Sequence, residues 1–311
     1  MHIRILGSAA GGRFPQWNCG CGNCVAVRRK KPRQKKFAGR PRTQAQLALS
    51  ADGSSWFLAG ASPDLAFQIE ATPALHPRAL RDSPVAGIVL ASADLDHVVG
   101  LLLLRELQPL RVYASQSILR ILREENSMFG MLNRADPQVV WTPMNAGAAF
   151  PLLDATGHES GLRCDVHYLA GRYPKYVKSS GLAPGEATAA LFFESTSAES
   201  ARTRVGYLPA ISRLDDRLLA KIDGLDLLLF DGTFWSDDEL IRVQGSGETA
   251  HQMGHIPVEE SLGLLKNVEV GRKMFVHINN TNAILNEAGS EHRVVRKAGW
   301  EVAEDNWHVE L

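Results

Sequence analysis

Apolar residues along the 311-residue chain fall in short runs separated by turns rich in Gly, Pro, Asp and Ser. Short apolar runs bounded by turn residues predict buried β-strands, since helices need longer periodic segments. The chain opens on such a run, HIRILG at 2–7, and the runs 45–50 and 55–60, joined by ADGS, predict a hairpin. Further predicted strands are 85–91, 110–114, 138–141, 162–169, 187–195, 203–209, 225–230 and 273–278, with a closing hairpin over 300–311.

Apolar residues three and four positions apart predict helices between these strands. The predicted helices are 64–70, 97–108, 115–125, 215–222, 257–268 and 290–299. Strands dominate both halves of the chain and helices intervene, which predicts an α/β sandwich of two mixed sheets flanked by helices. No segment rich in Pro, Gly or Ser divides the chain, so the prediction is a single domain, 1–311.

The composition is that of a globular protein, with 45% hydrophobic and 22% charged residues. The formal net charge is zero, so the chain as a whole does not attract nucleic acid or acidic membranes. The longest uncharged apolar run, near VVGLLLL, is too short to insert into a membrane, and no secretory signal is seen at the start. We therefore expect a cytoplasmic protein whose cysteines stay reduced.

Three of the four cysteines lie in NCGCGNC, at Cys19, Cys21 and Cys24. A redox CxxC pair usually opens a helix after a strand, whereas this motif follows Pro15 in a glycine-rich loop. Clustered thiolates instead predict a structural Zn²⁺ site in a cysteine loop of about residues 12–42. Cys164 lies in a predicted strand and is expected to be a core thiol. The fourth zinc ligand is expected to be a histidine, with His255 preferred, His277 as the rival and His251 third.

Acidic and histidine side chains follow several of the predicted strands, where functional groups often collect. They are Asp94, Asp96 and His97 after the strand that ends at Ala91, Asp231 after 225–230, and His277 at the end of 273–278; His251 and His255 precede a helix. An Asp in such a position can simply cap the next helix, and a single histidine there is often structural. Several such groups in one chain favour a metal centre.

The segment SADLDH, followed by a helix that begins VVGLL, resembles the metallo-β-lactamase superfamily, whose signature at this turn is HxHxDH. Asp96 and His97 match the closing pair of that signature, and His277 matches the histidine of its terminal strand. Ser92 and Asp94 stand where the signature has its first two histidines. The resemblance implies the metallo-β-lactamase fold, while the missing imidazoles argue against a di-zinc hydrolase, which needs two well-held metals.

A narrower resemblance covers most of the chain in order. Its segments are LGSAAGGRFPQWNCGCGNC, RTQAQLALSADGSSWFLAGASPDL, DLDHVVGLLLLRE, LFDGTFWSDDE, MGHIPVEESL and HINNTNAILNE, which are similar to the PqqB family of coenzyme PQQ synthesis proteins. The resemblance implies a role in making pyrroloquinoline quinone from a peptide-derived, cross-linked Glu–Tyr precursor, alongside other PQQ biosynthesis proteins. The implied step is an iron- and O₂-dependent hydroxylation of the tyrosine ring. A soluble carrier of PQQ or its precursor and a metal-dependent hydrolase are the alternatives.

Asp96, His97 and His277 together supply one carboxylate and two imidazoles. This is the ligand set of the facial triad that holds non-haem Fe²⁺ with open positions, although other divalent metals are alternatives. Asp231 is expected to act with them, either as a further ligand or by holding a ligating histidine. Asp94 is open to the same two interpretations.

Amide and aromatic side chains lie close in sequence to these groups. Asn279, Asn280 and Asn282 follow His277, while Thr233 and Trp235 follow Asp231. We expect these five to line the substrate pocket, since amides suit the carboxylates of an amino-acid-like ligand; the alternative is that they are turn residues. The basic stretch Arg28–Arg42 is either a solvated loop or a lip that attracts an acidic substrate.

Overall fold

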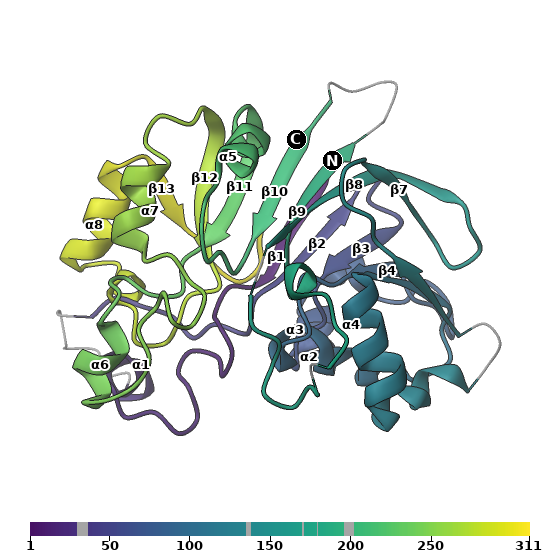
Figure 1. Ribbon diagram of the computed structural model, residues 1–311, viewed down its shortest axis with the longest axis horizontal. Coiled ribbons are helices and arrows are strands. Elements are labelled where there is room, and N and C mark those ends of the chain that lie inside the picture. Colours follow the sequence, from purple (N-terminus) through teal and green to yellow (C-terminus); the bar gives the residue numbers. More distant parts are fainter. Residues whose placement is uncertain (30–36, 135–137, 170, 179, 196–201) are drawn as a thin grey trace. The chain divides into compact units, whose positions relative to one another are not determined.

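The computed structural model describes residues 1–29, 37–134, 138–169, 171–178, 180–195 and 202–311 (Figure 1). The chain, expected from its sequence to be one domain, divides into two compact units. Unit 1 comprises Met1–Leu6, Gln46–Tyr207 and Asn306–Leu311, and unit 2 comprises Gly7–Ala45 and Leu208–Asp305. Each unit is described on its own below.

The largest sheet of unit 1 has the strand order β14-β1-β2-β3-β4-β5-β6. It combines antiparallel pairs, such as β2 with β3, and parallel pairs, such as β3 with β4. Its strands are β1 (His2–Gly7), β2 (Gln46–Ser50), β3 (Trp56–Ala59), β4 (Val85–Val89), β5 (Leu110–Ala114), β6 (Val139–Pro143) and β14 (Trp307–Glu310). The central strands β2 and β3 are buried along their whole length, which is why they read as continuous apolar runs.

Four further strands of unit 1 pair antiparallel in the order β10-β9-β8-β7. They are β7 (Phe150–Leu153), β8 (Glu159–Leu169), β9 (Thr188–Ser195) and β10 (Arg204–Leu208). The two sets of strands meet where the ring of Tyr113 stacks on Phe150, with ring centroids 5.7 Å apart, and where the Tyr113 hydroxyl accepts a hydrogen bond from the Leu153 amide at 2.7 Å. Cys164 on β8 is fully buried, which confirms the expected core thiol.

Short helices cover the largest sheet of unit 1 (Figure 1). They are α2 (Leu65–Glu70), η1 (Pro73–Leu75), α3 (Leu95–Val98), η2 (Val99–Leu104), α4 (Gln116–Arg120), η3 (Ile121–Glu125), η4 (Ser127–Asn133) and η5 (Pro184–Glu186). The helix predicted over 97–108 is instead one α-helical turn, α3, that continues as the 3₁₀ segment η2. Gly100 explains the close packing there: a Cβ at that position would lie 2.2 Å from the Ser62 carbonyl oxygen.

Unit 2 contains three parallel strands in the order β13-β12-β11: β11 (Leu225–Asp231), β12 (Val270–Val276) and β13 (Trp300–Val302). Its helices are α1 (Gly22–Arg29), α5 (Asp216–Ile222), α6 (Glu239–Gln244), α7 (Val258–Leu264), α8 (Ser290–Lys297) and η6 (Ala283–Leu285). Phe275 stacks on Trp300 with ring centroids 4.3 Å apart, and Phe230 meets both rings edge-on. This aromatic cluster fixes β11 and β12, whose ends carry the candidate site.

Two sequence-based predictions about local structure are wrong. Residues 300–311 do not form a hairpin, because β13 pairs with β12 while β14 pairs with β1. The CxxC part of the cysteine motif does open a helix, since α1 begins at Gly22 and includes Cys24. No described helix is long and apolar enough to cross a membrane.

Candidate metal centres

Two parallel strands of unit 2 bring Asp231 and His277 to the same edge of the sheet. Asp231 is the last residue of β11 and pairs in register with Val276, the last residue of β12, so His277 follows directly. His277 has a left-handed backbone conformation with φ of +56°. Such a conformation costs a non-glycine residue about 1–2 kcal/mol and persists only where surrounding contacts impose it. The strain marks His277 as a positioned side chain.

Asp231 is fully buried and accepts four hydrogen bonds. Its Oδ2 accepts from the Ile211 amide at 3.0 Å and from His255 Nδ1 at 2.7 Å. Its Oδ1 accepts from the Thr233 amide at 3.0 Å and from the Thr233 hydroxyl at 2.6 Å. Burial acts to raise the pKa of Asp231, but the charge and hydrogen bond of His255, with His277 and Thr233, hold it below its ordinary value. The carboxylate is therefore ionised and saturated with donors, which makes it an orienting group.

The same contacts fix the protonation of two imidazoles. His255 Nδ1 faces a carboxylate oxygen, so this nitrogen carries the proton. His277 Nδ1 lies 2.9 Å from the Thr233 hydroxyl oxygen, whose own proton is directed to Asp231. His277 is therefore also protonated at Nδ1, and in both rings Nε2 has the lone pair that binds a metal. The two rings are nearly parallel, with centroids 5.8 Å apart.

Ligand atoms of Asp231, His255 and His277 all lie within 4.8 Å of one another. The two imidazoles suit zinc or iron(II), and ligating histidines commonly donate their second N–H to a carboxylate, as His255 does to Asp231. Of the two roles expected for Asp231, holding a ligating histidine is the one its hydrogen bonds support. The donors present thus fit a divalent transition metal, and they lie within one unit.

Asp96 and His97 lie in unit 1 on the single turn of α3. His97 is buried, with 3% of its surface exposed, and its carbonyl accepts from the Ala61 amide at 2.7 Å. Gly60, at φ +86°, lies against this ring, since a Cβ there would be 3.4 Å from His97 Nδ1. Asp96 is half-buried. The convergence of this pair with His277 on one metal stays a prediction.

Asp94 was expected either as a further metal ligand or as a group that holds a ligating histidine. It is exposed, its carboxylate accepts from the Ser92 hydroxyl at 2.9 Å, and its carbonyl begins α3 by accepting from the His97 amide. Among the described residues it belongs to no group of three potential metal ligands. Its side chain makes no capping hydrogen bond to α3, so its expected role near a metal stays a prediction.

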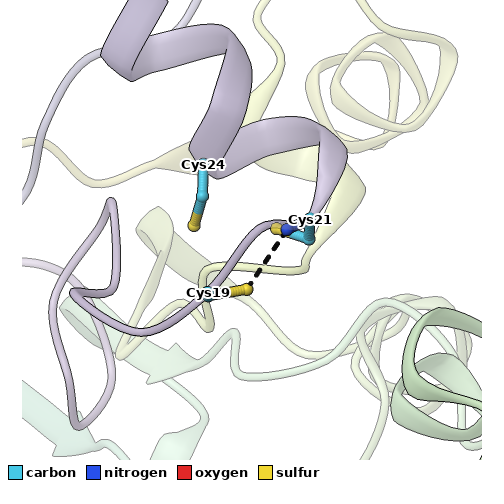
Figure 2. Close-up of side chains that lie close together, drawn as sticks. All are labelled: Cys19, Cys21 and Cys24. Carbon is cyan, nitrogen blue, oxygen red and sulfur yellow. Dashed lines mark hydrogen bonds between the residues drawn. The ribbon is translucent and has the colours of Figure 1, made fainter.

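The three clustered cysteines do form a compact group in unit 2. Cys19 and Cys21 lie in the loop before α1 and Cys24 in its first turn, and Figure 2 shows the three side chains gathered around one point. Their sulfur atoms all lie within 4.8 Å of one another, and no disulfide joins them. Burial raises the pKa of Cys24 to about 11, so a thiolate at this position needs a cation beside it. This donor set fits zinc.

No histidine completes the cysteine group among the described residues, so the expected fourth ligand is wrong. His255 and His277 lie with Asp231 instead, and His251 Nε2 contacts the Glu260 carboxylate at 3.0 Å. The side chain that reaches the sulfurs is Asn280, which the sequence prediction assigned to the substrate pocket. The indication of Asn280 in the sequence was its position in HINNTN, shortly after His277.

The other predicted pocket residues have structural contacts. Asn282 is fully buried: its Nδ2 donates to the Gly232 carbonyl at 2.8 Å, and its Oδ1 accepts from the Ile284 amide at 3.0 Å. Asn279 donates to the Thr281 hydroxyl, and Thr233 joins Asp231 to His277. The contacts of Asn282 are those of the alternative, a turn residue, whereas the side chain of Asn280 lies against the cysteine sulfurs. Trp235 is half-exposed, so its predicted role stays open.

The basic stretch is partly accounted for. Residues 30–36 lie outside the described residues. Arg28 donates to backbone oxygens of the cysteine loop, Arg40 pairs with Glu304 at 2.8 Å, and Arg42 is buried. These arginines support the structure of unit 2.

A cavity lies away from these residues. It encloses about 240 Å³ in unit 1 and is lined mostly by apolar side chains, among them Ile69, Leu75, Val85, Leu104 and Leu110. None of the predicted site residues lines it, and no potential metal ligands converge there. The cavity therefore has no part in the candidate chemistry.

Comparisons with known protein sequences show which proteins this chain is similar to. A sequence profile of the β-lactamase superfamily domain matches residues 55–278. Proteins named coenzyme PQQ synthesis protein B are similar over the full length: 40% identical in Rhodopseudomonas palustris, covering all of both chains, and 38% in Gluconobacter oxydans, covering 99% of this chain and 98% of the relative.

Solved structures are similar in fold. The crystal structure of Zn²⁺-bound PqqB from Methylobacterium extorquens matches with a TM-score of 0.88 and 38% identity over all of both chains. A diphosphatase from the PhnP family matches with a TM-score of 0.67 and 17% identity, over 100% of this chain and 96% of the other, which shows the fold alone. The predicted fold is confirmed: an α/β metallo-β-lactamase fold of two mixed sheets flanked by helices.

Proposed function

Because the chain belongs to the coenzyme PQQ synthesis protein B family, within the β-lactamase superfamily, we propose that it is an iron(II)- and O₂-dependent hydroxylase in PQQ biosynthesis. The name shared by full-length relatives supports the role in PQQ biosynthesis, and the fold supports a metal-dependent enzyme. The proposed substrate is the peptide-derived, cross-linked Glu–Tyr precursor, whose tyrosine ring gains a hydroxyl group.

The observation that supports the proposal is the orientation of two imidazoles, those of His255 and His277, by contacts with Asp231 and Thr233. With Nδ1 of His255 and His277 protonated, both rings offer Nε2 to a metal without having to lose a proton. A nitrogen- and oxygen-donor set without thiolate suits iron(II), which in such a site supports oxidation of a substrate by O₂. We propose Asp96 and His97 as the further ligands from unit 1.

The chain's own residues have a defined part in this chemistry. Asp231 accepts the hydrogen bond from Nδ1–H of His255 and so keeps that ring oriented. The Thr233 hydroxyl donates to Asp231 and accepts from Nδ1–H of His277, which keeps the second ring oriented. Hydroxylation inserts one oxygen atom of O₂ into a C–H bond of the ring. The second oxygen atom leaves as water, using two protons and two electrons from an external reductant.

Two residues of the SADLDH turn argue against the alternative of a metal-dependent hydrolase. Ser92 and Asp94 replace the two imidazoles that a second metal would need, and the structure engages Asp94 with the Ser92 hydroxyl. A hydrolase that uses a hydroxide bridging two metals needs both metals to be firmly held. Too few nitrogen ligands remain here to hold the second metal. The carrier alternative requires only binding, so turnover separates it from the hydroxylase.

The test is O₂ consumption by protein reconstituted anaerobically with Fe²⁺, then mixed with the Glu–Tyr precursor and ascorbate. We expect O₂ uptake matched to hydroxylated product in the wild type, and loss of both in His255→Ala. His251→Ala is the matched control, because His251 lies close in sequence but contacts Glu260 at the surface. Binding without O₂ uptake would favour the carrier, and product formed without O₂ would favour the hydrolase; either result overturns the proposal.

A further inference from the structure

The hydroxyl group of Tyr207 is buried without a hydrogen bond. Tyr207 lies near the end of β10, and 2% of its surface is exposed. Less than 1 Å² of its hydroxyl oxygen is exposed, and no hydrogen-bond partner contacts that oxygen among the described residues. Tyr113, which is equally buried in the same unit, differs: its hydroxyl accepts from the Leu153 amide at 2.7 Å and donates to the Leu153 carbonyl at 3.2 Å.

This unpaired hydroxyl lowers the stability of the folded protein, because burial removes its contact with water and no hydrogen bond compensates. A core position on this strand requires only an aromatic ring, which a Phe supplies without the polar atom. Phe193 fills such a buried position on the adjacent strand β9. The hydroxyl of Tyr207 therefore indicates a function other than packing.

The carboxylate of Asp96 acts on this hydroxyl. Burial raises the pKa of Tyr207, and the negative charge of Asp96 raises it further. The strands of unit 1 explain why the two residues are neighbours. The Ala189 amide of β9 donates to the Ala91 carbonyl at 2.8 Å, at the start of the turn that leads to α3 and Asp96. The next strand is β10, on which Tyr207 lies opposite Leu191 of β9.

We propose that Tyr207 is a positioning residue of the metal centre, whose hydroxyl donates a hydrogen bond to the Asp96 carboxylate when Asp96 binds the metal. The inference rests on the proposed role of Asp96 as an iron(II) ligand. Carboxylates that bind metals are themselves held by hydrogen bonds, and such supporting groups typically contribute about 10–100-fold to metal affinity. A hydrogen bond to one carboxylate oxygen leaves the other oxygen for the metal and fixes its direction.

Tyr207→Phe removes only the hydroxyl and tests the inference on the full-length protein. We expect iron(II) affinity, measured by anaerobic competition with a chromophoric chelator, to fall about 10–100-fold. The iron-free variant should unfold at a urea concentration equal to or above that of the wild type, because the unpaired hydroxyl is gone. Tyr113→Phe is the matched control: it should unfold at a lower urea concentration, because it loses both contacts with Leu153, and keep its iron(II) affinity.

Combining Tyr207→Phe with Asp96→Ala shows whether the hydroxyl acts through Asp96. In that background Tyr207→Phe should change the iron(II) affinity no further, because the group that it positions is gone. An unchanged affinity in Tyr207→Phe alone, or an equal loss in the Asp96→Ala background, overturns the inference, and so does a lower urea midpoint for iron-free Tyr207→Phe.

The same measurements separate this inference from the proposed function. Wild-type iron(II) affinity in Asp96→Ala would overturn the ligand role of Asp96 and the inference with it. Absence of O₂ uptake by a wild-type protein that binds iron(II) would overturn the hydroxylase alone.

Discussion

Replacing Asp231 by Asn tests how the two imidazoles are oriented. The Asp231 carboxylate accepts four hydrogen bonds, two at each oxygen. An Asn side chain has the same shape but only one acceptor oxygen. If that oxygen stays with Thr233, the new NH₂ group faces two donors, the Ile211 amide and His255 Nδ1.

The cost follows from these contacts. Each lost hydrogen bond to a charged acceptor is worth about 1.5–3 kcal/mol, so two losses amount to about 3–6 kcal/mol. His255 can recover one contact by moving its proton to Nε2 and accepting from the new NH₂ group at Nδ1. The Ile211 amide stays buried and unsatisfied, so we expect a net loss in the free energy of unfolding of about 1–3 kcal/mol. With its proton moved to Nε2, His255 no longer offers the lone pair of that nitrogen to a metal.

Two assays follow from this reasoning. Equilibrium urea unfolding should show the lower stability, and long-range ¹H–¹⁵N NMR should show the proton of His255 moved from Nδ1 to Nε2. Iron(II) affinity should fall about 10–100-fold, as for other groups that orient metal ligands. Asp226→Asn, at an exposed position of the same strand, is the control and should change stability by less than about 0.5 kcal/mol. Unchanged stability with His255 still protonated at Nδ1 would refute the role given to Asp231.

Three further substitutions have defined outcomes. Burial raises the pKa of Glu239 from 4.5 to about 7, so the folded protein binds this proton more tightly than the unfolded chain, and stability should fall by about 3 kcal/mol as pH rises from 4.5 to 7. Glu239→Gln should remove that slope, and urea midpoints at several pH values that keep it would contradict the assignment. Asn282→Ala should lower the free energy of unfolding by about 2–4 kcal/mol, because it leaves buried backbone groups unsatisfied; a loss below about 1 kcal/mol in urea unfolding would count against this. Asp94→Ala should leave the metal content of the purified protein unchanged, and a lost equivalent would restore Asp94 as a ligand.

The sequence predicted which segments are strands better than which strands pair. Apolar runs such as 85–91 and 225–230 signal burial directly, and β4 and β11 lie there. The closing hairpin was wrong because strand pairing depends on the register of distant segments: β13 joins β12, and β14 joins β1. Local alternation of apolar residues contains no information about such partners.

The candidate site shows the same difference between residues that local sequence patterns indicate and contacts that depend on the tertiary fold. Strand ends identified Asp231 and His277, because polar side chains after buried strands are visible in the sequence. The contact of His255 with Asp231 joins residues 24 positions apart and depends on the tertiary fold, so the sequence assigned His255 to the cysteines instead. Asn280 was misassigned for a similar reason: its contact with the sulfurs of Cys19 and Cys24 joins segments that only the tertiary fold brings together.

The proposed hydroxylation is tested most directly by the fate of labelled oxygen in a single turnover of iron(II)-loaded protein with the Glu–Tyr precursor under ¹⁸O₂. We expect a product that has gained one ¹⁸O atom on its tyrosine ring in wild-type protein and no such product in His255→Ala. A product that takes its new oxygen atom from water, or an unchanged precursor recovered from protein that holds its full complement of iron, would contradict it.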